Sequence, residues 1–139
     1  MALNVRKDEL AKLWAHARAG YPYEVVGILA GQRASETVVR VVPLENERAD
    51  SPQNRYHVSA MVLYKAEQKL EAEGLEVVGY YHSHPDHPAR YSDFDREHAL
   101  PNMAYVITAV HGGEVVETRC WRLTEDREAM TETALFSQD

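Results

Sequence analysis

The sequence contains very little cysteine, no long run of apolar residues and no cluster of basic residues. The single cysteine, Cys120, excludes an internal disulfide bond and every structural zinc site that is built from several thiolates. A metal ion bound by this chain must therefore be held by histidine and carboxylate side chains.

The apolar residues never form a segment that could cross a membrane. No stretch approaches the roughly 20 consecutive apolar residues that a membrane-spanning helix needs. Residues 1–20 mix charged and apolar residues and lack the continuous apolar segment of a signal peptide. We therefore expect a cytoplasmic protein with no membrane partner.

The charge balance is acidic, with a formal net charge of −7 and scattered lysines and arginines. A protein that binds nucleic acid usually presents a basic face, which replaces the counterions of the phosphates. We expect no nucleic-acid partner, whereas a neutral or basic polypeptide suits an acidic protein.

The length of 139 residues suits one domain with a hydrophobic core of its own. We predict a single domain over residues 1–139. Its functional motifs lie between residues 21 and 123, and residues 124–139 form a weakly patterned tail. No repeat or linker divides the chain.

Hydrophobic periodicity predicts a mixture of helices and strands. The predicted helices cover residues 4–19, the segment between Ser59 and Gly74, and residues 92–100. The predicted strands cover residues 24–31, 37–44, 75–82, 104–110 and 114–123. Residues 45–55 are predicted to be an exposed loop, and "TETALF" in the tail fits an edge strand or a frayed helix. We predict an α/β (α+β) fold, in which helices flank a central mixed β-sheet.

Candidate metal ligands are concentrated in "GYYHSHPDHPARYSDFD", residues 79–95. Alternate side chains of a strand share one face, so His82 and His84 can both reach one ion. Asp95 lies in the first turn of the helix that Ser92 begins, where a third ligand would complete a set of two histidines and one carboxylate. The other candidates in the stretch are predicted to lie on the loop: Asp86, His87 and Asp93.

Three protein ligands leave one position of a tetrahedral metal open, as in catalytic rather than structural zinc sites. Hydrolysis at such a site also needs a base, which must come from elsewhere in the sequence. Glu24 is suitable because it stands at the start of an apolar strand, where an unpaired charge would be costly. The pattern alone does not select it over Glu45 or Glu97.

These residues together resemble the signature of the JAMM (MPN-plus) zinc metalloproteases. His82-Ser83-His84-Pro85 is followed by Ser92-x-x-Asp95, and the upstream "YPYEVVGILAG" is similar to the segment that carries the family's catalytic glutamate. The resemblance runs from about residue 5 to about residue 123. The residues around Ser92, with Tyr91 before it and Asp93-Phe94 after it, differ from the family's usual small residues.

The resemblance implies a cytidine-deaminase-like MPN/JAMM fold and one zinc ion per chain, held by His82, His84 and Asp95. It also implies that Glu24 acts as general base on the metal-bound water and that Ser92 helps to hold the oxyanion. Short bacterial and archaeal members act on ubiquitin-like or sulfur-carrier proteins that end in Gly-Gly. No long insertion is present, so linkage-specific cleavage of ubiquitin chains is not expected.

Several readings of these residues remain open at the level of sequence. Ser92 and Asp95 also satisfy a helix capping box, and Glu24 could simply pair with Arg33 or Arg40. The alternative functions are a non-catalytic MPN-type module that binds a ubiquitin-like partner, and a non-haem iron enzyme that uses two histidines and one aspartate. The oligomeric state, the identity of the carrier and the choice between a peptide and an isopeptide bond are not determined.

Overall fold

The computed structural model describes residues 2–46 and 58–139. Within these residues, seven strands follow one another around a closed barrel in the order β1-β3-β2-β4-β5-β6-β7. The strands are β1 (Ala2–Arg6), β2 (Val26–Gln32), β3 (Thr37–Leu44), β4 (Glu76–Pro85), β5 (Ala104–His111), β6 (Glu114–Leu123) and β7 (Met130–Gln138). The helices are α1 (Lys7–Gly20), α2 (Ala60–Ala72) and α3 (Asp93–His98). The predicted mixed sheet is confirmed, since strand pairs of both directions occur.

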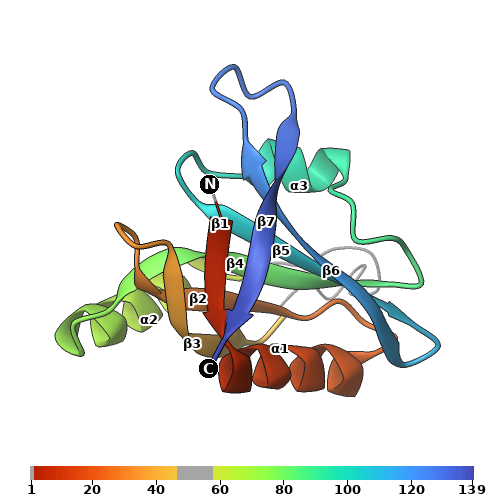
Figure 1. Ribbon diagram of the computed structural model, residues 1–139, viewed down its shortest axis with the longest axis horizontal. Coiled ribbons are helices and arrows are strands. Elements are labelled where there is room, and N and C mark those ends of the chain that lie inside the picture. Colours follow the sequence, from red (N-terminus) through yellow and green to blue (C-terminus); the bar gives the residue numbers. More distant parts are fainter. Residues whose placement is uncertain (1, 47–57) are drawn as a thin grey trace.

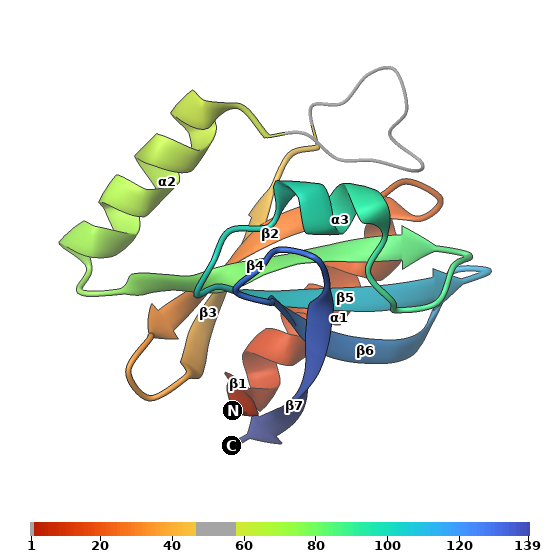
Figure 2. The ribbon, with the colours of Figure 1, turned by 90° about the horizontal axis from the view of Figure 1, so that it is seen from above.

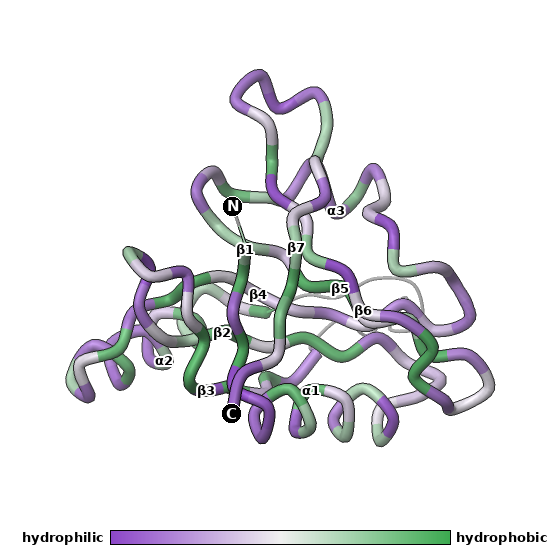
Figure 3. Tube along the Cα trace, in the orientation of Figure 1, coloured by the Kyte–Doolittle hydropathy of each residue, from purple (hydrophilic) through white to green (hydrophobic). Residues whose placement is uncertain are grey.

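The helices cover the two faces of the sheet. Figure 1 shows α1 running across the ends of β1 and β7. Figure 2 shows α2 and α3 together on the opposite side of the sheet. Strand β5 contributes to both sides, because Val106 and Val110 join the core with α1 whereas Ile107 and Ala109 join a second cluster. Such burial on both faces explains its almost continuous apolar sequence, visible in Figure 3.

The N-terminal segment corrects the prediction of a helix over residues 4–19. Residues 2–6 form strand β1, and helix α1 begins only at Lys7. Leu3 and Val5 alternate into the core, and β1 pairs in parallel with both β3 and β7. The helical periodicity itself is confirmed further along, where Leu10, Leu13 and Ala17 are buried. The pairing partners are distant in sequence, so local periodicity did not reveal the strand.

The C-terminal tail is more regular than predicted. "TETALF" lies inside β7, which pairs with β6 on one side and with β1 on the other. It is therefore neither an edge strand nor a helix, because β1 covers the side on which an edge would lie. The hydrophilic turn between β6 and β7 projects from the barrel in Figure 3.

The remaining elements agree closely with the sequence. Ser59 caps α2 by accepting a hydrogen bond from the Val62 N–H at 3.3 Å, and β2 and β3 form the predicted hairpin. Most of the predicted loop at 45–55 lies outside the described residues. Within the described part of the chain, no helix is both long and apolar enough to cross a membrane.

The placement of β1 in the core gives a stability prediction. Leu3 is 0% exposed, so Leu3→Ala should lower the free energy of unfolding by about 2–5 kcal/mol through lost burial and a residual cavity. Val116→Ala in β6 is the control, because Val116 is 52% exposed and should change stability by less than about 0.5 kcal/mol. Urea unfolding measures both. Equal, small effects would mean that residues 2–6 are not part of the core.

Candidate metal centre

The two histidines of the motif lie at the end of β4, between strands β2 and β5. This strand continues through His-Ser-His-Pro to Pro85, beyond the predicted end at residue 82. His82 is 1% exposed, and its Nε2 atom lies 3.2 Å from Nε2 of His84. The alternation of the strand thus places both imidazoles on one side, as the sequence predicted.

Asp95 reaches both histidines from the first turn of α3. Its Oδ1 lies 3.0 Å from Nε2 of His82, and its Oδ2 lies 3.2 Å from Nε2 of His84. The capping box is formed as well: Ser92 Oγ accepts from the Asp95 N–H at 3.1 Å, and Asp95 Oδ2 accepts from the Ser92 N–H at 2.9 Å. The two readings of this segment are therefore compatible, since one carboxylate caps the helix and faces the histidines.

Glu24 is buried beside the same histidines, although it lies two residues before β2 rather than within the strand. Its backbone carbonyl accepts a hydrogen bond from Asn46 Nδ2 at 3.1 Å. One ligand atom each from Glu24, His82 and His84 all lie within 4.8 Å of one another. The suggested partner Arg40 instead pairs with Glu73.

Ser83, to which the sequence analysis assigned no role, joins the two halves of the site. Its Oγ accepts a hydrogen bond from the Val25 N–H at 2.9 Å, and its own N–H donates to the Val25 carbonyl at 3.1 Å. Ser83 is 1% exposed, so these bonds are shielded from water. In the sequence, this role is indicated only by the place of a small polar residue between two candidate ligands. The residue next to Glu24 is thus tied to the residue between the two histidines.

Burial and charge act against each other on the histidine and aspartate groups. Burial alone lowers the pKa of His82, but the charge and hydrogen bond of Asp95, with a contribution from Glu24, raise it overall. Burial raises the pKa of Asp95, but His82 and His84 hold it well below its ordinary range. Each group thus stabilises the charged form of its neighbour.

His84 is oriented by a hydrogen bond on its other nitrogen. Nδ1 lies 2.9 Å from the carbonyl oxygen of Pro88, which can only accept. Nδ1 therefore carries a proton, and in the neutral ring that would bind a metal the lone pair lies on Nε2, which faces His82 and Asp95. This is the tautomer that a metal ligand requires.

The donor set fits a small tetrahedral metal ion. Bonds of 2.0–2.1 Å to zinc place neighbouring tetrahedral ligand atoms about 3.3 Å apart. His82 Nε2 lies 3.2 Å from His84 Nε2, and the two nitrogens lie 3.0 Å from Asp95 Oδ1 and 3.2 Å from Asp95 Oδ2, respectively. Imidazole nitrogen and carboxylate oxygen are also ligands that zinc accepts. A carboxylate oxygen of Glu24 lies within 4.8 Å of a ring nitrogen of each histidine, which is a wider limit than the separations above. Spacing alone therefore also allows Glu24 near the ion.

The remaining polar residues of the motif have other partners. Asp86 is not a free loop residue: it accepts hydrogen bonds from Tyr21 Oη at 2.7 Å and from the Gly112 N–H at 3.0 Å. His98 stacks on Phe94 and lies within hydrogen-bonding distance of its carbonyl, one turn beyond Asp95. Asp93, predicted to lie on the loop, is instead the exposed first residue of α3. Among the described residues the grouped ligand atoms come from Glu24, His82 and His84 alone, and Asp95 is a candidate through its direct contacts with both histidines.

Two of the candidate ligands, His84 and Asp95, open together with Glu24 onto a hollow of about 380 Å³, whereas His82 is buried behind them. A second, apolar hollow lies beside α3 and α2, and Val26, Tyr80 and Phe94 contribute to its wall. The first hollow is lined by Glu24, His84, Pro85, His87, Pro88, Arg90, Tyr91, Ser92 and Asp95. A substrate in the first hollow can therefore contact the donor set directly.

Two proteases are similar to this chain over most of its length. A probable TtuB-protein conjugate cleaving protease from Thermus thermophilus is 38% identical over 112 residues, which cover 81% of this chain and 73% of the relative. A desampylase from Haloferax volcanii is 33% identical over 115 residues, covering 79% and 82%.

A solution structure of a protein from Desulfitobacterium hafniense shares the fold. Its TM-score is 0.84 at 26% sequence identity, and the match covers 100% of this chain and 94% of that chain. Residues 6–124 match the family described as prokaryotic homologs of the JAB domain. The match spans most of the chain and includes Glu24, His82, His84, Ser92 and Asp95, so the chain belongs to the prokaryotic JAB family.

Proposed function

We propose that this chain is a zinc-dependent peptidase or isopeptidase with one zinc ion per chain. Its substrate is the amide bond that follows the C-terminal Gly-Gly of a ubiquitin-like or sulfur-carrier protein. The observation that carries the proposal is the convergence of His82, His84 and Asp95 beside the buried Glu24. Family membership and the Thermus relative, named as a probable conjugate-cleaving protease, support it.

His82, His84 and Asp95 are the residues that would hold the metal. When bound, zinc supplies Lewis acidity, which polarises a carbonyl and brings the pKa of a water molecule toward neutrality. The complete donor set also speaks against a binding module without catalysis, which needs no buried carboxylate and imidazole groups of this kind. Elemental analysis separates zinc from the iron of an oxygenase.

Glu24 and Ser92 would act on the substrate itself. The Glu24 carboxylate takes a proton from the attacking water and returns it to the leaving nitrogen, as the new C–O bond forms and the C–N bond breaks. Ser92 Oγ is an acceptor in the helix cap, so its hydroxyl hydrogen is free to donate to the substrate's carbonyl oxygen. Both side chains line the same hollow.

Hydrolysis should depend on Glu24. The test substrate is a diglycine-ended carrier protein extended by one residue, and mass spectrometry follows loss of that residue. Glu24→Gln should lower the rate by about 10²–10⁴-fold because the base is lost, while zinc stays bound. Glu97→Gln, on the exposed side of α3, is the control and should leave the rate unchanged. Wild-type activity that survives Glu24→Gln would contradict the assigned base.

Metal binding should depend on Asp95 and not on its neighbour. Asp95→Asn keeps the size of the side chain but removes its charge, and should weaken zinc binding by more than the 10–100-fold that loss of an outer hydrogen-bond partner typically costs. Asp93→Asn makes the same charge change in the same helical turn and should leave affinity intact. Chelator competition measures both. Equal affinities would favour Glu24 as the third ligand.

The metal-free protein should lose stability as the pH rises through the pKa of His82. That pKa is raised above 6.5, so the stabilisation by protonated His82 is complete below pH 6.5 and lost above it. The pKa of Asp95 is lowered from 3.8, so its contribution is present above pH 3.8 and lost in acid. Zinc replaces the proton on His82 and should remove the loss of stability on the alkaline side.

Urea unfolding from pH 4 to pH 8, with and without zinc, measures this dependence. Burial lowers the pKa of His16, which gives the unfolding free energy a slope against pH of opposite sign. The difference in slope between wild type and Asp95→Asn therefore isolates the contribution of the His82–Asp95 pair. Identical slopes for these two proteins without zinc would refute the coupling.

A further inference from the structure

Four residues of the segment 86–91 line one wall of the hollow beside the ligands: His87, Pro88, Arg90 and Tyr91. Hydrogen bonds of the Ala89 backbone attach this segment to the barrel. The Ala89 N–H donates to Glu117 Oε1 at 2.9 Å, and its carbonyl accepts from Trp121 Nε1 at 2.9 Å. Ala89 is 0% exposed, so both of these bonds form against the outer face of β6. The backbone that leads into Arg90 therefore has a defined position.

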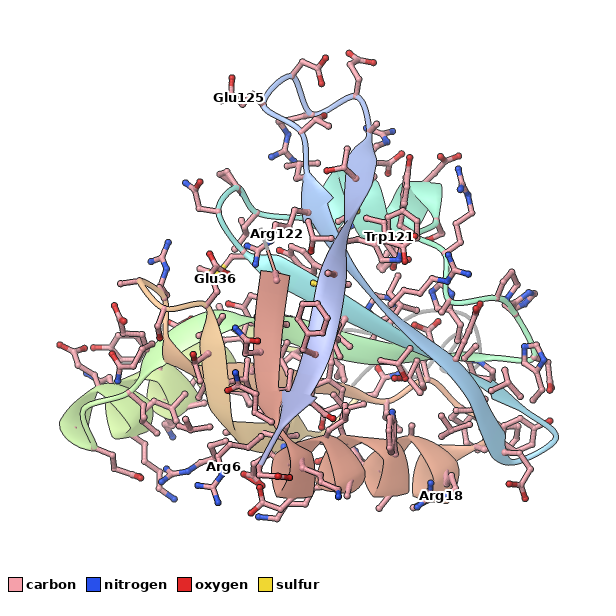
Figure 4. The ribbon with its side chains drawn as sticks, viewed as in Figure 1. Arg6, Arg18, Glu36, Trp121, Arg122 and Glu125 are labelled. Carbon is pink, nitrogen blue, oxygen red and sulfur yellow. The ribbon has the colours of Figure 1, made fainter. Side chains whose placement is uncertain are left out.

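The Arg90 side chain is exposed and lies beside two aromatic rings. Its guanidinium carbon lies 5.4 Å from the centre of the Tyr91 ring and 6.0 Å from the centre of the Trp121 ring, and these two rings contact each other edge to face. Figure 4 shows Trp121 on the side of the barrel near α3. Contacts through the face of a guanidinium leave its N–H donors, which lie in its plane, available.

Those donors have no acceptor within the described part of the chain, where Arg90 forms neither a hydrogen bond nor an ion pair. Other arginines of this sheet behave differently: Arg119 pairs with Glu117 and Glu132, and Arg122 with Glu36. A planar guanidinium with free donors, beside two rings at the wall of a hollow, suits a carboxylate that arrives with a ligand.

The size of the hollow limits what that ligand can be. Its volume of about 380 Å³ is that of a site for a small group rather than for a folded domain. A diglycine tail carries no charge, and the apolar hollow beyond α3 offers a separate surface to the carrier. The wall that carries the charge of Arg90 is therefore better suited to the leaving amino acid than to the diglycine tail.

We infer that Arg90 binds the α-carboxylate of a single amino acid that follows the carrier's Gly-Gly. This inference rests on the proposed function and names its leaving group. The α-carboxylate lies one residue, about 3.5 Å along the chain, from the scissile carbonyl. Arg90 stands two positions before Ser92, the residue assigned to that carbonyl, on the same wall. A lysine side chain leaving from an isopeptide bond presents no carboxylate at this distance.

The test compares three substrates that share one diglycine-ended carrier. The first ends in alanine with a free carboxylate, the second in alanine amide, and the third is joined to the ε-amine of lysine amide. Wild type should cleave the first with a kcat/KM about tenfold or more above the other two. Arg90→Gln should remove this preference by raising KM for the free acid while kcat is retained, because binding is lost and chemistry is not.

Two further variants separate charge recognition from packing. Arg90→Lys keeps the charge and should restore part of the preference, whereas Arg18→Gln makes the same charge change on exposed α1, away from Trp121 in Figure 4, and should leave it intact. The ratio of acid to amide cleavage is measured within each variant, so a loss of folded protein does not alter it.

Each remaining outcome has a defined meaning. An equal effect of Arg90→Gln on all three substrates, or no effect on any, would overturn the assignment of Arg90. A fourth substrate, ending in aspartic acid α-amide, places the carboxylate on the side chain; if it equals the free acid, the α-carboxylate assignment fails. If wild type cleaves none of the four, the proposed function itself is wrong.

Discussion

The two hydrogen bonds between Val25 and Ser83 determine where the halves of the candidate site meet. Glu24 precedes a strand and the histidines end another, and nothing in the local sequence of either segment fixes their separation. Because the Val25–Ser83 junction is buried, breaking it would leave polar groups without water, which is far costlier than losing an exposed hydrogen bond. The position of Glu24 relative to His82 and His84 thus depends on a residue that takes no part in the chemistry proposed for the site.

Burying several ionisable groups together is expensive unless each is compensated. In this site the compensation is mutual, since Asp95 raises the pKa of His82 and the histidines lower that of Asp95. The same carboxylate also caps α3, so formation of the capping box brings its charge to the histidines. A cation between these groups would replace the proton they otherwise share. The arrangement therefore combines local folding with preparation of a metal site.

The sequence predicted those parts of the molecule that depend on short-range patterns. Alternation placed His82 and His84 on one face, the cap at Ser92 placed Asp95, and the periodicity of α1 identified its buried face. It could not predict β1 and β7, because their regularity comes from pairing with each other across the length of the chain. The partners of Asp86 and the junction at Ser83 were missed for the same reason: Tyr21 and Val25 are close only in the folded barrel.

The groups proposed for chemistry and the group proposed for specificity are held in place by different parts of the fold. His82, His84 and Asp95 are carried by a central strand and a capped helix, whose positions are determined by the core. Arg90 is carried by a wall that is anchored at Ala89, and its guanidinium rests on rings rather than on the metal ligands. A substitution at Arg90 thus changes the charge of the hollow without moving the donor set. Because the two parts are held separately, a change in the wall can alter what the hollow binds without altering the strand and the helix that carry the donor set.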